Sequence, residues 1–242
     1  MKKTVTFIAG LVLATAAFGQ VTGSTYVDVG NKYLNPGFGD VLCDDTVIQP
    51  GVDLEFGNGF NGGLWFSHSP NGQERDYGEE LDFIFGWSGP MPKQMALPEG
   101  SEMEVNLTYY DEPTRLVFGE GDIWCLSTRA SVPLEITTLS FGVSRYEPMP
   151  GSDFPAAWLF GPAIERTFDL GSDFSVTAEN QLNYGHGYGL GSGFVFNPNI
   201  SLNYSVSEEV TWSLKATGYV QLGTNDEREN ELAISAGVEK SF

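Results

Sequence analysis

The C-terminal segment, residues 231–242, alternates between apolar and polar side chains along most of its length. A period of two places neighbouring side chains on opposite faces of a β-strand, so one face is apolar and the other is polar. The segments 174–184, 194–205 and 210–221 repeat the pattern. After residue 20, no apolar stretch approaches the roughly 18 residues that a membrane-spanning helix needs. The pattern therefore predicts an antiparallel all-β chain.

The same alternation, together with the lengths of the connections, predicts how many strands there are. Four further alternating segments and four less regular ones bring the total to about 12, at 48–56, 80–87, 102–109, 139–144, 22–33, 60–68, 122–132 and 156–168. Short turns and long polar loops alternate between the segments, as in bacterial transmembrane barrels. We therefore expect a transmembrane antiparallel up-and-down β-barrel, although the connection 88–101 is too long for a short turn. Proline residues within strands predict bulges or shortened strand ends, at Pro50, Pro162 and Pro198.

A soluble β-sandwich would also alternate, so the two faces have to be compared. The polar face here is rich in Asn, Ser, Thr, Gly and carboxylates, which suits a narrow, hydrated lumen. Aromatic residues lie toward the strand ends, as in the interfacial girdles of membrane barrels: Trp87, Tyr184, Phe194 and Tyr204. These features favour the membrane barrel over the soluble fold.

The first 19 residues have the features of a secretory signal peptide. Lys2 and Lys3 precede a short apolar core at 6–17, and Ala17 and Gly19 are the small residues expected before a cleavage site. An uncleaved membrane helix is the alternative, but the apolar run is too short for a full span. We expect cleavage after Gly19, export to the outer membrane, and a barrel formed by residues 20–242.

The charge balance excludes one class of partner. The chain has 12 basic and 32 acidic residues, a formal charge of −20. Nucleic acid is therefore not expected to bind, because its phosphates would be repelled. The two cysteines, Cys43 and Cys125, would reach an oxidising compartment near the same end of the barrel, which permits a disulfide between them.

The terminal strand carries a second targeting feature. Gly237 and the final Phe242 fit the C-terminal sorting signal of outer-membrane barrels, which implies that the barrel-assembly machinery is a partner. Lys240 departs from that signal at a position that is usually apolar, although a lysine there could reach the membrane interface.

Several short motifs in the first half of the chain resemble a known family. They are Tyr26-Val27, Gln49-Pro50-Gly51 with Asp53, Gly63-Leu64-Trp65 with Ser67, and Asp82 with Gly86-Trp87-Ser88-Gly89. This stretch resembles the Gcw_chp-type outer-membrane barrels of proteobacteria, a family of unknown function. The resemblance covers about a quarter of the chain and implies the same barrel and export route, but no reaction.

The lumen-facing charges are the candidate functional residues. Eight carboxylates have the inward parity of their strands: Asp53, Glu55, Glu80, Asp82, Glu102, Glu104, Glu165 and Glu179. Arg129 and Lys215 are the inward bases. This excess of acid predicts either a narrow porin-like channel for cations or small polar solutes, or a structural barrel with a hydrogen-bonded interior.

The sequence leaves two other functions open. An outer-membrane lipid or lipopolysaccharide hydrolase would use Ser67 and His68, but adjacent strand residues point to opposite faces. His186 lies in a glycine-rich run with no acid at a fixed spacing. A surface interaction protein would bind through the loops at 68–78 or 222–230. We expect no enzyme and no cofactor.

Three acidic clusters lie in the long loops, which are expected at the outer surface of the membrane. They are Asp44-Asp45, 74–80 and 226–231. Such clusters could hold divalent cations that bridge to lipopolysaccharide, and outer-membrane lipids are expected partners. The spacing fits no calcium-loop motif, so we predict no bound metal.

Overall fold

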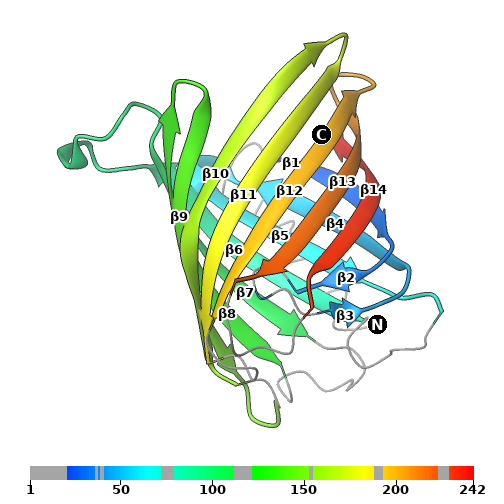
Figure 1. Ribbon diagram of the computed structural model, residues 1–242. Helices are drawn as coiled ribbons and strands as arrows, with labels where there is room; N and C mark the ends of the chain where they lie inside the picture. Colours follow the sequence, from blue (N-terminus) through cyan, green and yellow to red (C-terminus); the bar gives the residue numbers. More distant parts are fainter. Residues whose placement is uncertain are drawn as a thin grey trace.

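Twelve antiparallel strands close into a barrel in the computed structural model (Figure 1). The structure describes residues 21–35, 38, 41–71, 79–111, 122–152, 155–187, 193–222 and 229–242. The barrel strands are β1 Thr22–Gly30, β4 Val47–Glu55, β5 Phe60–Ser67, β6 Glu80–Pro90, β7 Glu102–Asp111, β8 Ile123–Leu134, β9 Thr137–Pro148, β10 Ala157–Gly171, β11 Phe174–His186, β12 Gly193–Ser205, β13 Val210–Gln221 and β14 Glu231–Ser241. From β4 to β14 each strand pairs with the next along the chain.

Strand β1 closes the barrel by pairing with both β4 and β14, where Val27 lies opposite Pro50 and Val238. The prediction of a twelve-stranded up-and-down barrel is confirmed. In the described part of the chain, no helix is long and apolar enough to cross a membrane. The predicted signal peptide, residues 1–19, lies outside the described residues.

The two faces of the wall differ as the alternation predicts. Large apolar side chains are exposed on the outer face, among them Leu107, Phe141, Ile200, Leu214 and Ile234. Polar side chains of the opposite parity are buried inside, including Asp82, Ser140, Asn183 and Asn197. A soluble β-sandwich buries its apolar face, so this arrangement excludes that alternative.

Beside each of the three prolines within the strands, two consecutive ladder pairs are missing on one side and the register is unchanged. Beside Pro162, the pairing between β10 and β11 passes from Phe160–Tyr184 directly to Ala163–Gln181. The ladders beside Pro198 and Pro50 are interrupted in the same way. The prediction of bulges or shortened strands at these positions was wrong. Each proline keeps its pairing on the other side, so the missing N–H costs bonds to one neighbour only.

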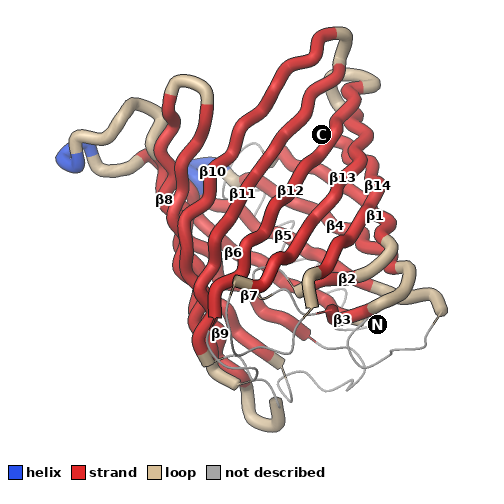
Figure 2. Tube along the Cα trace, viewed as in Figure 1, coloured by secondary structure: helices blue, strands red, loops and turns tan. Residues whose placement is uncertain are grey.

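The long connection at 91–101 lies at the end of the barrel that carries the short turns. It contains one turn of 3₁₀ helix, η2 Lys93–Met95, which Figure 2 shows projecting from the side of the barrel. The N–H of Met91 donates to the carbonyl of Ser101 over 2.8 Å and closes the base of the loop. The other connections at this end are short, and they include the 3₁₀ turn η1 Gly57–Gly59.

Strand β10 rises above its neighbour at the same end. Its pairing with β9 ends at Glu165, opposite Thr138, whereas β10 continues to Gly171 and pairs there only with β11 (Figure 1). Apart from Arg166, the outer face of this overhang is apolar, with Phe168 and Leu170 of β10 and the neighbouring Phe174 of β11 exposed.

A short hairpin after β1 departs from the predicted strand at 22–33. Strand β1 ends at Gly30, and β2 Tyr33–Leu34 pairs with β3 Val41–Cys43 in a separate two-stranded sheet. We call residues 31–35, 38 and 41–46 the inner segment. Its apolar side chains are buried against the inner wall of the barrel, with Phe38 only 1% exposed.

Both cysteines are buried as free thiols, so the structure does not contain the disulfide that the sequence permitted. Cys43 packs with Tyr33 and Val47 in the inner segment. Cys125 lies on β8 opposite Tyr146 of β9. The two thiols therefore lie in separate environments, one in the inner segment and one on the barrel wall.

Candidate channel lining

The eight predicted carboxylates are spread over five strands and occupy the inward parity of each. Asp53 and Glu55 come from β4, Glu80 and Asp82 from β6, Glu102 and Glu104 from β7, Glu165 from β10, and Glu179 from β11. Glu55, Glu102 and Glu165 lie in exposed positions toward the short-turn end. The remaining five lie farther from that end, so the acids form a dispersed lining rather than one cluster.

The two predicted bases each pair with a carboxylate on a non-adjacent strand, Arg129 past two strands and Lys215 past one. Arg129 on β8 donates to Ser140 of β9 over 2.9 and 3.1 Å, and its Nη2 lies 2.8 Å from Oε1 of Glu179 on β11. Lys215 on β13 places Nζ 3.0 Å from Oδ2 of Asp28 on β1. Sequence reasoning missed Asp28 because it lies in one of the irregular segments. Its shared parity with the polar residues Ser24 and Tyr26 was the available signal.

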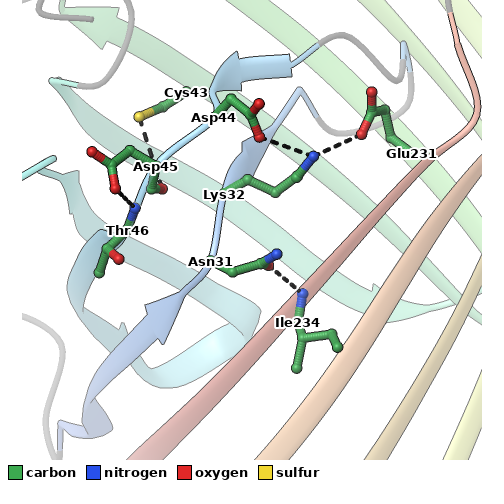
Figure 3. A network of polar contacts seen from close by, with 8 residues as sticks. All are labelled: Asn31, Lys32, Cys43, Asp44, Asp45, Thr46, Glu231 and Ile234. Carbon is green, nitrogen blue, oxygen red and sulfur yellow. Dashed lines mark hydrogen bonds and ion pairs between the residues drawn. The ribbon is translucent and has the colours of Figure 1, made fainter. Parts of the chain in front are cut away.

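A third base, Lys32, lies on the inner segment and was also missed. Its Nζ lies 3.0 Å from Oδ1 of Asp44 and 2.8 Å from Oε2 of Glu231 on β14 (Figure 3). The carboxylates of Glu231 and Asp44 accept hydrogen bonds from the ammonium group and raise the pKa of Lys32 above its usual value. Lys32 therefore links the inner segment to the barrel wall.

Asp82 is the most deeply buried of the predicted acids, with 8% of its surface exposed. Its Oδ1 atom has no hydrogen-bond partner. Glu80, two residues earlier on the same face, accepts a hydrogen bond from the hydroxyl of Tyr33 over about 3.2 Å. Burial raises the pKa of the Tyr33 phenol and the charge of Glu80 raises it further, so Tyr33 stays a donor at neutral pH. Tyr33 thus binds one of the two inward carboxyl groups of β6 and lies near enough to the other, Asp82, for its charge to raise the pKa of Tyr33 as well.

A polar cavity of about 230 Å³ lies against strands β7 to β11. Glu104, Asn106, Arg129, Ser140 and Gln181 are among the side chains that line it. Glu104 accepts a hydrogen bond from Asn106, and Arg129 is turned toward Glu179. Glu104 and Arg129 are direct partners in the ladder between β7 and β8, yet their charges are turned toward different neighbours. The lumen here is wide enough for water or a small polar solute.

The candidate hydrolase residues do not form a catalytic pair. Ser67 is fully buried and its Oγ accepts a hydrogen bond from Gln49 over 3.3 Å. The ring of His68 points the other way, where Nδ1 lies 3.1 Å from Oε1 of Glu79 and the ring stacks with Phe66. His186, at the end of β11, lies opposite Trp158 of β10. A nucleophile and its base have to lie within hydrogen-bond reach, which Ser67 and His68 do not.

The first acidic pair of the loops, Asp44 and Asp45, has protein partners. Besides the Lys32–Asp44 pair, Asp45 accepts hydrogen bonds from Asn71 over 2.8 and 2.9 Å. Within the described ranges, no group of three metal-ligating side chains gathers. Most of the other two acidic clusters, at 74–78 and 226–228, lies outside the described residues.

No family model matches the chain, and no curated protein matches its sequence. Several solved structures are similar in fold. The KdgM porin in complex with disordered oligogalacturonate is 9% identical, with a TM-score of 0.58 over 91% of this chain and 99% of that chain. The NanC porin is 9% identical, with a TM-score of 0.58 over 90% and 100% of the two chains. An outer-membrane channel from Pseudomonas putida F1 is 11% identical, with a TM-score of 0.54 over 92% and 95%.

At these identities the likeness concerns the fold alone. The resemblance to the Gcw_chp-type barrels stays a prediction. The chain has the fold of outer-membrane porins and channels.

Proposed function

We propose that this protein is a non-enzymatic, narrow outer-membrane channel that favours cations or small polar solutes. The similarity in fold to porins and channels supports assignment as a channel. The excess of acidic over basic side chains in the interior supports a preference for cations, and one observation carries this preference. Lys32, Arg129 and Lys215, the bases on the inner side of the described barrel, are each already paired with a carboxylate.

Several acids of the lining are left without such a partner. Within the described residues, Asp53, Glu55 and Glu104 form no ion pair with a basic side chain. A wall with unbalanced negative charge lowers the energy of a cation in the lumen and raises that of an anion. The expected solute is therefore a small cation, or a small neutral molecule that can hydrogen-bond to the wall.

Location and partners belong to the same proposal. Residues 1–19 would direct export, and the barrel-assembly machinery would read the terminal strand, with Gly237 and Phe242 as its signal. Outer-membrane lipids and lipopolysaccharide would surround the apolar outer face. Exposed aromatic side chains on that face, such as Trp158, Trp212 and Phe194, support contact with lipid.

Conductance of the refolded protein in a planar bilayer tests the function. Under a potassium chloride gradient, the reversal potential should have the sign of a cation-selective pore. The charge-neutral variants Asp53→Asn and Glu104→Gln should each reduce that selectivity. The matched control is Glu135→Gln, which removes an exposed carboxylate from the turn between β8 and β9. Anion selectivity, or no conductance from protein shown to be folded, would contradict the proposal.

A further inference from the structure

The inner segment reaches three separate arcs of the barrel wall. Tyr33 and Cys43 pack with Val47 of β4 and Trp65 of β5. Leu34 packs with Val195 of β12 and Tyr219 of β13, and Phe38 packs with Ala157 and Leu159 of β10. Strands β4 and β10 are six strands apart in either direction around the barrel, and β13 lies midway between them. A segment that touches all three must therefore cross the opening.

Polar contacts fix the beginning of this segment to β14, as Figure 3 shows. The N–H of Asn31 donates to the carbonyl of Ile234 over 3.0 Å, and the N–H of Ile234 donates to the side-chain oxygen of Asn31 over 2.7 Å. Lys32 adds its ion pair with Glu231 of β14, and Tyr33 its hydrogen bond to Glu80 of β6, four strands farther around the barrel. Polar contacts thus hold the segment at two separate places on the wall.

The composition of this segment is unusual for its position. The interior of the barrel is polar along the strands, yet Tyr33, Leu34 and Phe38 bury large side chains with apolar surface inside it. Phe38 also lies against Gly185 of β11, where an added Cβ would come within 3.2 Å of its ring. Apolar side chains packed this closely leave no room for a hydrated solute between them and the wall.

We propose that the inner segment is the constriction of the channel, and that Tyr33, Leu34 and Phe38 determine which solutes pass. The inference rests on the proposed function. The segment also shields the carboxyl pair Glu80 and Asp82 from the lumen, because Tyr33 lies over Glu80. Displacement of the segment would then widen the pore and bring this acid pair into contact with the permeating ion.

The first experiment compares the wild-type barrel with the triple variant Tyr33→Ala, Leu34→Ala and Phe38→Ala. Single-channel conductance should rise several-fold, and proteoliposomes should swell in larger sugars than the wild type admits. The matched control replaces three exposed apolar residues near the short-turn end, Met95→Ala, Leu97→Ala and Ile136→Ala. Heat-modified migration on gels checks that each variant is folded.

A second comparison tests the shielded acid pair. Asp82→Asn should leave the cation selectivity of the wild-type channel nearly unchanged. The same substitution in the triple variant should lower selectivity clearly, because Asp82 is then exposed to the ion. An equal effect in both backgrounds would show that the inner segment shields nothing.

A third measurement covers the case in which the triple variant does not fold. Lys32→Met removes one anchor, so a thiol reagent should label Cys43 faster than in the wild type, with peptide mapping to separate Cys43 from Cys125. Lys93→Met, in the exposed connection at 91–101, is the matched control and should leave labelling unchanged. Unchanged labelling of Cys43 in Lys32→Met would overturn the anchoring.

The outcomes separate this inference from the proposed function. If the wild-type protein conducts and the folded triple variant conducts equally, the constriction is wrong and the channel stands. If only the triple variant conducts, the inner segment is a plug, which overturns both the channel function and the constriction. If neither conducts, the proposed function itself fails, and the constriction fails with it.

Discussion

Lys215 and Asp28 form an ion pair across an intervening strand, with Nζ and Oδ2 3.0 Å apart. They lie on β13 and β1, and β14 runs between them. Gly237 of β14 lies directly opposite Asp28, and a Cβ at that position would overlap the Asp28 carboxylate. The pair exists because this residue has no side chain.

Replacement of Gly237 should therefore destabilise the barrel where β1 meets β14. Gly237→Val should lower the free energy of unfolding by about 1–3 kcal/mol, the usual cost of forcing extra volume into a packed site. Urea unfolding in detergent micelles, followed by tryptophan fluorescence, measures this loss of stability.

The control for this prediction is Gly142→Ala on β9. Gly142 also faces the lumen, but an added Cβ would lie 3.8 Å from its nearest neighbour, the carbonyl of Thr128. This variant should be close to wild type in stability. Equal losses in both variants would mean that Gly237 does not act through Asp28.

Charge changes at the Arg129–Glu179 pair should shift ion selectivity in opposite directions. Arg129→Met removes a positive charge from the lining and should increase the preference for cations, whereas Glu179→Gln should decrease it. The pair is partly exposed, so its contribution to stability should stay below about 1 kcal/mol. Reversal potentials in planar bilayers give the readout.

Arg166→Met is the matched control for that series. Arg166 lies on the outer face of β10, where its guanidinium carbon is 4.4 Å from the ring centroid of Phe168. Its removal should not alter selectivity. A shift as large as that of Arg129→Met would place the selectivity determinant elsewhere.

The ion pairs of Lys32 predict an alkaline limit for the inner segment. Because the pKa of Lys32 is raised in the folded protein, its stabilising effect is fully present below its ordinary pKa of 10.5 and is lost as the pH rises through the higher, folded value. The difference in unfolding free energy between wild type and Lys32→Met should be constant near neutral pH and shrink only above 10.5. Urea unfolding of both proteins at several pH values measures this difference. If the two proteins were equally stable at neutral pH, the prediction would be contradicted.

Phe242 should matter for assembly in cells more than for stability in vitro. Its backbone exchanges hydrogen bonds with Gly23 over 2.9 and 3.2 Å, while its side chain is exposed on the outer face. Phe242→Ala keeps the backbone bonds and should refold normally in detergent. The amount of folded protein in outer-membrane fractions should fall, because the proposed sorting signal is altered.

The control for this effect is Ile136→Ala, which removes an exposed apolar side chain from the turn between β8 and β9. It should leave both refolding and membrane insertion unchanged. Normal insertion of Phe242→Ala would remove Phe242 from the sorting signal.

The barrel could be predicted from the sequence because alternation is a local property. The outward position of Leu214 and Ile234, for example, follows from their neighbours in the chain. The partner of Lys215 could not be predicted in this way, since Asp28 is 187 residues away and the pair depends on closure of the barrel. Strand parity gave the direction of the side chain but not its partner.

The inner segment escaped prediction for a different reason. An apolar residue in a membrane barrel is expected to face lipid, and Tyr33 appeared to extend the alternating strand that precedes it. The structure instead buries Tyr33, Leu34 and Phe38 inside the barrel. The signal that was available is the concentration of apolar residues in a long loop, because loops at that end are otherwise polar.

The overhang of β10 has a consequence for the surrounding lipid. Its exposed Phe168 and Leu170 extend the apolar outer surface past the last β9 residue that pairs with β10. A bilayer of uniform thickness cannot match a wall that is taller on one side. The barrel should therefore lie tilted from the membrane normal, or the acyl chains beside β10 should stretch to cover the extra height.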